Sequence, residues 1–332
     1  MWRNWFIFGL TIISTSCKTG EIDDVDPLKE EINLTVSHHL YPGTNVKAFA
    51  FAEANHWFFA SGSEITQVKN NQKTVFSAPS AVISMDWNIK EETLWFGTDS
   101  SGLGQLKDGA LNYYTRESHG LPRTNYIRDV TCDDDGGTWF NTSAHKMGGL
   151  GYHKNGIFSF FTPDNSILPD NLVKSIARNG NNLFVATGGY VNQQKVVKIS
   201  NGSWTLLPVT GYYLMDMAVD KDNKVYIIDD YSLSSVVTQS KIILLKEEST
   251  QTISPEIPPG SWYHPYVLAV DRRNYLWAAQ FAISSAKILQ VFNGIKWLEP
   301  QTFPDSFINC ISVDSKNTVW IGTNNGIYLL DQ

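Results

Sequence analysis

The chain has 332 residues, of which 42% are hydrophobic, 13% are aromatic and 18% are charged, and its formal net charge at pH 7 is −7. This apolar content is ample for a large core, and a low charged fraction is typical where repeated units bury their faces against one another. The acidic balance and the lack of any Lys/Arg cluster argue against nucleic acid as a partner.

The first residues have the features of a targeting segment. Arg3 supplies a positive charge, residues 5–13 form an apolar run too short to span a bilayer, and small residues precede Cys17. The arrangement resembles a bacterial lipoprotein signal, which implies that residues 1–16 are removed and that Cys17 becomes the lipidated first residue. Ser14 departs from the Leu usual in that signal, and a plain secretory signal cut elsewhere is the alternative.

Residues 17–31 are acidic and carry few large apolar side chains, so we expect a solvated tether. The domain predicted after it spans residues 32–332. Its first strand, at residues 32–37, precedes any complete repeat, while the last residues, 326–332, supply only a third strand for the final repeat. Joining the two would close a ring and remove two open sheet edges.

A short phrase recurs seven times between these ends. At its clearest it reads Asp314-Ser-Lys-Asn-Thr-Val-Trp320-Ile-Gly-Thr323. A period of roughly 40 residues with short β-runs is typical of propeller blades. The sequence therefore predicts an all-β, seven-bladed β-propeller, whose aromatic anchors are Trp57, Trp95, Trp139, Phe184, Tyr226, Trp277 and Trp320.

The third repeat shows the expected layout of one blade. Alternating segments at 126–131, 138–142, 149–153 and 157–161 predict four antiparallel strands, and Asn155-Gly156 is a strong hairpin signal between the last two. No segment has sustained helical periodicity. Cys132 and Cys310 lie in apolar first-strand positions of distant repeats, so we expect two unpaired, buried thiols.

The repeat can be compared with a known family. The Leu-Pro-x-Asn phrase that ends a unit (Leu168 to Asn171), the Asp of the first hairpin and the Trp-Ile-Gly-Thr strand resemble the two-component-regulator propeller repeat. The resemblance implies a propeller fold and a role in sensing or binding, often tied to glycans. No transmembrane, kinase or DNA-binding segment follows Gln332, so the chain itself is not expected to be the signalling receptor.

Most groups of residues that could indicate chemistry have a structural interpretation instead. A large aromatic residue at a fixed slot fills the wedge between blades, and the Asp six residues before it caps a turn. Asp133-Asp134-Asp135 lacks the spaced ligands of a calcium loop, the histidines have no chelating spacing, and no hydrolase or phosphate-loop motif occurs. We predict no metal and no cofactor, although carboxylates from different blades could still meet in the central funnel.

The candidate binding residues lie in loops that are expected to share one face of the ring. Aromatic faces combined with amide and carboxylate groups suit a glycan or a protein ligand. An exposed rim whose aromatics merely pack on neighbouring blades is the alternative. The residues chosen from the loops of blades four and five are Tyr190, Asn192, Tyr231, Trp262, Tyr263 and His264.

The leading hypothesis is a monomeric, lipid-anchored outer-membrane propeller, facing the cell surface or the periplasm, that binds a glycan or protein without chemistry of its own. It would contact the membrane only through its lipid. A propeller lyase or glycoside-active enzyme is the second hypothesis, and a structural adaptor of an outer-membrane complex is the third. An enzyme predicts clustered carboxylates with shifted pKa values in the funnel, and an adaptor predicts a wide exposed apolar patch.

Overall fold

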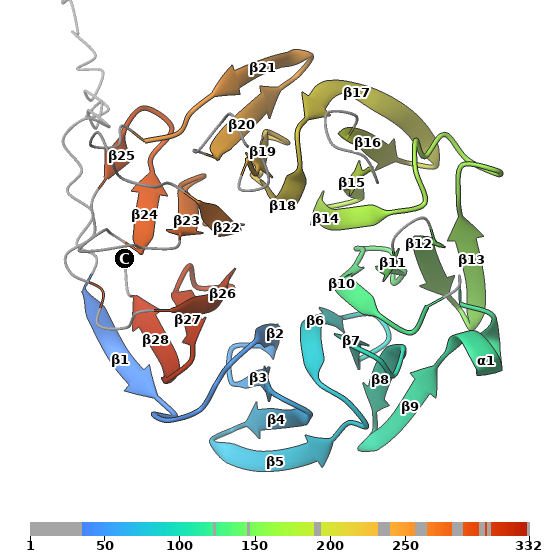
Figure 1. Cartoon of the computed structure of the whole chain (residues 1–332). Coiled ribbons are helices and arrows are strands. Elements are labelled where there is room, and N and C mark those ends of the chain that lie inside the picture. Colours follow the sequence, from blue (N-terminus) through green and yellow to red (C-terminus); the bar gives the residue numbers. More distant parts are fainter. Residues whose placement is uncertain are drawn as a thin grey trace, which may run out of the picture. The chain divides into compact units, whose positions relative to one another are not determined.

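The computed structural model describes residues 35–121, 124–144, 147–188, 194–231, 240–255, 264–280, 288–298, 303 and 307–330. These residues form a ring of seven four-stranded antiparallel sheets, as predicted (Figure 1). In each blade the first strand lies nearest the ring axis and the fourth lies at the outside.

Each of the first three blades is a meander of four strands. Blade one contains β2 (Ala48–Glu53), β3 (His56–Ser61), β4 (Glu64–Lys69) and β5 (Gln72–Ser77). Blade two contains β6 (Val82–Asn88), β7 (Thr93–Thr98), β8 (Leu103–Lys107) and β9 (Ala110–Tyr114). Blade three contains β10 (Ile127–Cys132), β11 (Thr138–Ala144), β12 (Met147–Lys154) and β13 (Ile157–Phe161).

The next three blades repeat this order. Blade four contains β14 (Val173–Asn179), β15 (Asn182–Thr187), β16 (Gln194–Ser200) and β17 (Ser203–Gly211). Blade five contains β18 (Leu214–Val219), β19 (Val225–Asp229), β20 (Lys241–Lys246) and β21 (Ser249–Thr252). Blade six contains β22 (Pro265–Val270), β23 (Leu276–Gln280), β24 (Leu289–Phe292) and β25 (Trp297–Leu298).

Blade seven joins the two ends of the domain. It contains β26 (Ile308–Val313), β27 (Val319–Thr323), β28 (Gly326–Leu330) and, as its outer strand, β1 (Val36–Leu40). β1 pairs antiparallel with β28, from Val36 opposite Leu330 to Leu40 opposite Ile327. The predicted closure is confirmed, with the strand a few residues later than expected. Residues 32–34 and the whole segment 1–31 lie outside the described residues.

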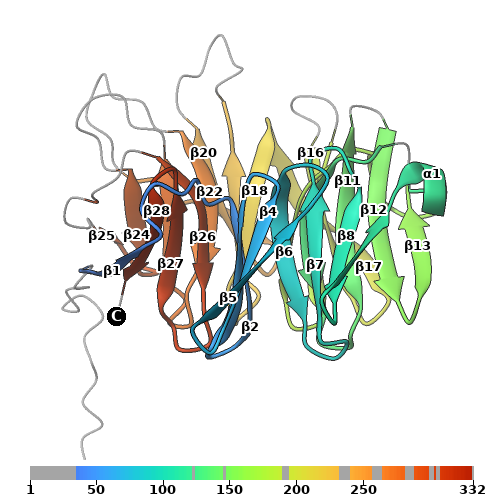
Figure 2. The ribbon, with the colours of Figure 1, turned by 90° about the horizontal axis from the view of Figure 1, so that it is seen from below.

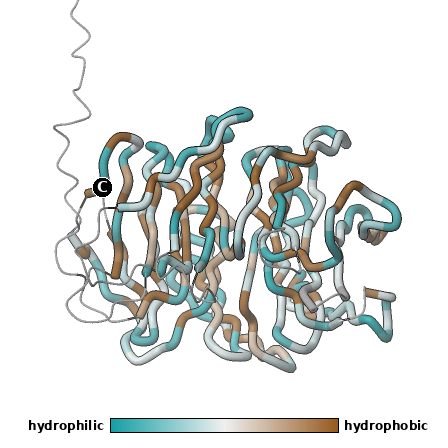
Figure 3. Tube along the Cα trace, turned by 45° about the horizontal axis from the view of Figure 1, so that its top comes forward, coloured by the Kyte–Doolittle hydropathy of each residue, from teal (hydrophilic) through white to brown (hydrophobic). Residues whose placement is uncertain are grey.

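The core lies between the blades, where the anchor of each second strand packs. Trp95 and Trp277 are fully buried, and the other anchors are buried as well, except Trp139, which is only partly buried. In Figure 3 the apolar segments recur along the strands and the turns are mostly hydrophilic. The wedge-filling role predicted for the anchors is therefore confirmed for six of them, and Trp139 fills its wedge only in part.

The Asp six residues before an anchor holds both the turn and the anchor. Asp314 Oδ1 accepts hydrogen bonds from the backbone N–H of Lys316 (2.8 Å) and of Thr318 (2.9 Å), while its Oδ2 accepts one from Trp320 Nε1 (3.0 Å). Asn317 adopts a left-handed φ of 69° within this turn, a conformation that Asn tolerates. The turn cap was predicted from the sequence, whereas the indole hydrogen bond was not.

Two smaller features complete the comparison with the sequence. Cys132 and Cys310 are free thiols, Cys132 buried as predicted and Cys310 only partly buried. Burial raises the pKa of Cys310 to about 12 and that of Cys132 well above its ordinary value, as expected for inert cysteines. A single helical turn, α1 (Arg116–His119), was not predicted. It exists because Thr115 and Ser118 form a capping box, and it is too short to produce a periodic pattern.

The ring has two functionally distinct ends, seen edge-on in Figure 2. Because the strands are antiparallel, the turns between strands one and two and between strands three and four lie at one end, which we call the hairpin face. The loops between strands two and three and the links to the next blade lie at the other end, the connection face. Tyr231 and His264, the predicted binding residues that the structure describes, belong to the connection face.

Candidate ligand-binding rim

Two of the six predicted binding residues, Tyr231 and His264, belong to the described residues. Tyr231 follows β19 and His264 precedes β22, so both lie at the connection face of blade five or at its link to blade six. The other four, Tyr190, Asn192, Trp262 and Tyr263, lie outside the described residues, as does Cys17. The description below is restricted to the groups around Tyr231 and His264, which we call the rim site.

The rim site contains a stacked pair of tyrosines from blades four and five. The rings of Tyr212 and Tyr231 have centroids 4.9 Å apart and planes inclined by 16°. Asp229, at the buried end of β19, fixes the backbone below them, because its Oδ1 accepts the N–H groups of Tyr212 (2.7 Å) and Tyr213 (3.0 Å). The backbone at Gly211 lies close to Leu214: a Cβ at this position would be 2.2 Å from the Leu214 side chain, which accounts for glycine there.

A lysine adds a positive charge to the same surface. Lys241 Nζ lies 5.3 Å from the ring centroid of Tyr231 and 3.5 Å from Asp229 Oδ2. Burial lowers the pKa of Lys241, but the interactions with Tyr231 and Asp229 outweigh this effect and raise its pKa above the ordinary value. The ammonium group is therefore charged at neutral pH and anchored beside the tyrosine ring, where a cation is favoured.

A second polar group links the β19–β20 loop to the start of blade six. Ser240 Oγ donates to Asp230 Oδ1 (2.5 Å) and accepts the backbone N–H of Tyr231 (3.1 Å). His264 Nδ1 lies 2.9 Å from the same Oγ. The Ser240 hydroxyl donates its single proton to Asp230, so it can only accept in the contact with His264. His264 Nδ1 is therefore the donor. The arrangement orients the imidazole at the rim.

This Asp–Ser–His grouping is not a nucleophilic triad. A nucleophilic serine must give its proton to histidine, which in turn is held by the carboxylate. Here Ser240 donates to Asp230 and receives from His264, so the hydroxyl is not activated by a base. The rim site has the chemistry of recognition: flat aromatic rings, a cation, and donors and acceptors of fixed direction.

A third tyrosine extends the rim toward blade four. Lys174, the second residue of β14, is 6% exposed, and its Nζ donates to Tyr213 Oη at 2.6 Å. The sequence analysis did not single out Lys174, Ser240 or Lys241. Lys241 carried an available signal, because it begins a strand whose next four residues are apolar; Lys174 lies in a largely polar strand and Ser240 precedes β20.

Carboxylates do occur on the inner strands, where the enzyme hypothesis places them. Each is partly buried and accepts a backbone N–H from the first strand of a neighbouring blade. The pairs are Asp86 with Cys132 (2.7 Å), Asp129 with Ile176 (3.2 Å) and Asp216 with Leu268 (2.9 Å). In each case the next blade has a residue at the same strand position as the Asp, and the N–H comes from the residue that follows it. The same kind of contact therefore links three pairs of neighbouring blades.

The three aspartates that link the blades have raised pKa values. Burial raises the pKa of Asp129 to about 6, with the charge of Asp216 adding to the rise and Arg128 opposing it. Burial likewise raises the pKa of Asp86 and Asp216. A raised carboxylate pKa is compatible with an acid–base role, but backbone hydrogen bonds already occupy these groups, which favours a structural one.

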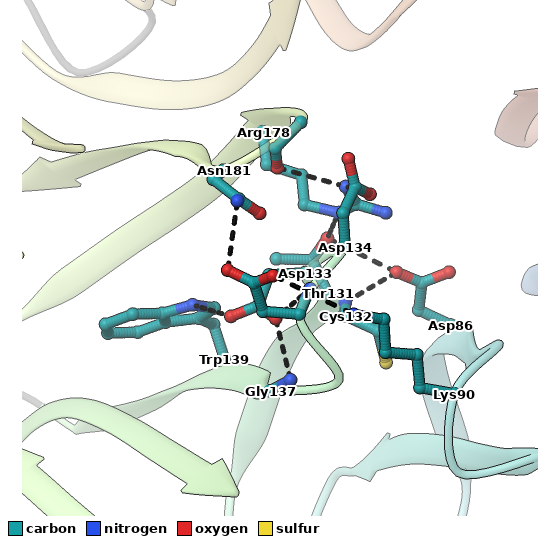
Figure 4. Close-up of polar contacts among 12 residues, drawn as sticks. Asp86, Lys90, Thr131, Cys132, Asp133, Asp134, Gly137, Trp139, Arg178 and Asn181 are labelled. Atoms are coloured by element: carbon teal, nitrogen blue, oxygen red, sulfur yellow. Dashed lines mark hydrogen bonds and ion pairs between the residues drawn. The ribbon is translucent and has the colours of Figure 1, made fainter. Parts of the chain in front are cut away.

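The triple-aspartate turn of blade three, drawn in Figure 4, is engaged within the protein. Asp133 Oδ1 accepts the N–H of Gly137 at 2.7 Å, and its Oδ2 accepts Trp139 Nε1 at 3.2 Å. A Cβ at Gly137 would lie 2.3 Å from the Tyr152 ring, which accounts for glycine there.

The other two carboxylates of this turn bind the flanking blades (Figure 4). Asp134 pairs with Arg178 at 3.0 Å, and Asp135 accepts Asn181 Nδ2 at 3.0 Å and lies 3.8 Å from Lys90 Nζ. Within the described part of the chain, no group of three or more His, Cys, Asp or Glu side chains is placed to hold a metal ion. In the same part of the chain, the search for a helix of membrane-spanning length and hydropathy found none.

Comparisons with known proteins agree with the fold. Residues 302–325 match the family model described as two component regulator propeller. The extracellular domain of a putative hybrid two component system from B. thetaiotaomicron is similar in structure, with a TM-score of 0.64 and 14% identity. The match covers 87% of this chain and 40% of that one, so the chain spans less than half of the sensor domain.

Two further structures are similar at comparable scores. Virginiamycin B lyase from Staphylococcus aureus has a TM-score of 0.68 and 15% identity, with 90% of this chain and 99% of the lyase covered. PorZ, a surface component of the type-IX secretion system of Porphyromonas gingivalis, has a TM-score of 0.64 and 16% identity over 87% of this chain and 47% of PorZ. At such identities the likeness shows the fold alone. A comparison with curated proteins found no match.

Proposed function

We propose that the protein is a non-catalytic binding propeller that holds a glycan or a protein segment at the rim site. The observation that carries the proposal is the stacked Tyr212–Tyr231 pair, held beside the Lys241 ammonium and the oriented His264 imidazole on one face. An aromatic platform with directional polar groups is the usual composition of such sites. The repeat match and the similar extracellular sensor domain support a recognition role.

A binding screen tests this proposal. The purified chain is applied to a glycan array and to a peptide array, and Tyr231→Ala is compared on any hit. We expect binding to weaken roughly tenfold to a hundredfold, because removing one stacked ring costs on the order of 1–3 kcal/mol. The melting temperature should stay close to wild type. Trp262→Ala is expected to behave in the same way.

A matched control is available on the same face. Tyr126 is an exposed tyrosine of the connection face, just before β10 in blade three and away from the rim site. Tyr126→Ala should leave binding unchanged. Equal losses in Tyr126→Ala and Tyr231→Ala would refute the rim site, and so would unchanged binding in Tyr231→Ala.

The enzyme hypothesis has one specific observation in its favour, the inner-strand carboxylate Asp129 with its raised pKa. The similar structures include a virginiamycin B lyase. Incubation with virginiamycin B, followed by mass spectrometry, tests this directly. Conversion by the wild-type chain that is lost in Asp129→Asn would replace the binding proposal, whereas an unchanged compound leaves it in place.

The adaptor hypothesis predicts a wide apolar patch, and the exposed apolar residues do not support one. Among the described residues they come from several blades and turns: Val75, Ile89, Tyr126, Ile157, Ile167, Leu206 and Ile295. Single exposed apolar side chains are normal for a soluble surface.

The location belongs to the same proposal. We place the monomeric propeller at the outer membrane, held there by acyl chains on Cys17, because the first 17 residues resemble a lipoprotein signal. Cys17→Ala should abolish incorporation of labelled fatty acid and move the protein to the soluble fraction. A Cys17→Ala variant that still fractionates with membranes would contradict the lipid anchor.

A further inference from the structure

A cavity of about 300 Å³ lies between blades one and two, and the turns that line it belong to the hairpin face. The β2–β3 turn beside it is short. The repeat that contains Trp57 has Phe51 where blades three, five, six and seven have the turn-capping Asp, and β2 passes to β3 through only Ala54 and Asn55. At the next interface Asn88 Nδ2 reaches Gly136 O (2.9 Å) across the blades. No hydrogen bond among the described residues joins the β2–β3 turn to blade two, and a recess remains.

Aromatic rings form the apolar part of this cavity. Trp87 of blade two stacks on Phe58 of blade one, with centroids 5.5 Å apart and planes inclined by 20°. The imidazole of His56 meets the same indole edge-on at 5.3 Å. Leu106 and Phe76 complete the apolar lining. A cavity of this size and lining suits a small organic ligand with an apolar part.

The wall formed by blade one carries two hydrogen-bond donors, Lys69 and His56, beside the carboxylate of Glu53. Glu53, His56 and Lys69 are register partners in successive strands, so their side chains lie in one row. Gln67 Nε2 donates to His56 Nε2 at 2.7 Å, so Nδ1 carries the imidazole proton. His56 is only 8% exposed, and the hydrogen bond to Gln67 uses its Nε2. Its Nδ1 is not among the fully enclosed polar atoms that lack a partner, so this donor is open to a molecule in the cavity.

The wall formed by blade two carries acceptors. Glu92, in the β6–β7 turn, and Asp108, in the β8–β9 turn, both line the cavity. Each has a φ of 50°, a left-handed conformation that places the residue at a turn of the hairpin face. Within the described residues neither carboxylate has an ion-pair partner. The donors of the cavity thus lie on the blade-one wall, beside the Glu53 carboxylate, and the blade-two wall carries two further carboxylates.

We propose that this cavity binds a free α-amino acid with an apolar side chain. The ligand carboxylate lies against Lys69 and the Nδ1–H of His56, the ligand ammonium lies against Glu92 and Asp108, and the apolar side chain packs on Trp87. A zwitterion offers a carboxylate to the donors of the blade-one wall and an ammonium to the carboxylates of the blade-two wall. A neutral sugar leaves Glu92 and Asp108 without a charged partner, and a simple cation offers no acceptor to Lys69 and the His56 N–H.

The site is independent of the rim site. Its residues come from blades one and two at the hairpin face, whereas the rim site lies between blades four, five and six at the connection face. Loss of binding at one site therefore leaves the other to be tested on its own.

Calorimetric titration of the full chain with L-leucine tests the proposal. Lys69→Met and Glu92→Gln should each weaken leucine binding roughly tenfold or more, because each removes a charge-assisted contact worth about 1.5–3 kcal/mol. Both residues are exposed, so these variants keep the fold. Lys246→Met and Glu247→Gln are matched controls, since they change an exposed third-strand lysine and a left-handed glutamate of blade five. The controls should bind like wild type.

Ligand analogues test the two charges separately. N-acetylleucine lacks the ammonium and leucinamide lacks the carboxylate, so both should bind roughly tenfold or more weakly than leucine. Glucose should not bind. Absence of leucine binding into the millimolar range overturns the proposal. It is also overturned by equal binding of leucine and leucinamide, by stronger binding of glucose, or by an equal loss in the blade-five controls.

Discussion

At the scale of single residues, the hairpin aspartate does more than cap a turn. Asp271 accepts the backbone N–H groups of Arg273 (2.9 Å) and Tyr275 (3.0 Å) and the indole of Trp277 (3.2 Å). One carboxylate thus fixes both the loop geometry and the orientation of the largest side chain of the blade. Burying an indole N–H without a partner would be costly, and the repeated Asp supplies that partner.

The anchors therefore differ in what they contribute. Trp277 is fully buried, so Trp277→Ala should destabilise the fold by about 3–5 kcal/mol, as truncation of a core aromatic does. Trp139 is only partly buried, so Trp139→Ala should cost clearly less. Urea unfolding monitored by circular dichroism measures both. Equal losses in the two variants would contradict the difference in packing.

The same residues show why some features could be predicted from the sequence and others could not. The Asp and the aromatic residue six positions later lie within one repeat, so the blades could be predicted from the sequence. The partial exposure of Trp139 depends on how Tyr152 and the next blade pack against it, which spacing does not encode. The cavity beside blade one had no specific local signal, because Ile89 and Arg178 also replace the turn-capping Asp, and its lining comes from two repeats. The rim site needed the pairing of Tyr212 with Tyr231 across blades.

At the scale of strands, the first strands of neighbouring blades are tied by carboxylates. Asp129 on β10 accepts the N–H of Ile176 on β14, and Asp216 on β18 accepts that of Leu268 on β22. Such contacts align one blade with the next, which apolar packing between blades does not do in a directional way. They also place partly buried titratable groups in the inner layer.

The Asp129 contact gives the stability a defined pH dependence. The folded pKa of about 6 lies above the ordinary 3.8, so the folded state binds the proton more tightly than the unfolded chain. This group therefore penalises folding above about pH 6, and the penalty disappears as pH falls through 6 toward 4. The melting temperature of wild type should rise relative to Asp129→Asn between about pH 7 and pH 5. Differential scanning calorimetry at both pH values measures this.

A control separates this effect from a change of net charge. Asp164 is an exposed carboxylate of the link between blades three and four. Asp164→Asn should keep the wild-type dependence of melting temperature on pH. If the melting temperatures of wild type and Asp129→Asn change in parallel between pH 7 and pH 5, Asp129 does not have the raised pKa described above.

At the scale of the whole molecule, the ring depends on β1. Deletion of residues 35–40 should lower the melting temperature substantially, because β28 loses its outer partner and exposes an edge. Deletion of residues 18–30 should have little effect, since that acidic tract has few large apolar side chains to bury. Thermal unfolding of the two truncations makes the comparison. Equal melting temperatures would contradict closure by β1.

The seam in blade seven also governs the order in which the chain can fold. Ser37 donates its hydroxyl to Leu329 O, a contact between residues 292 positions apart. On the ribosome β1 leaves the exit tunnel first, and its partner β28 leaves after every other strand. Six blades can form as they emerge, but the ring cannot lock until translation of the domain is nearly finished. Contacts of such sequence separation are slow to form, so the seam is the expected last step of folding. Until then β1 is an unpaired strand, and its edge is open to pairing with another chain.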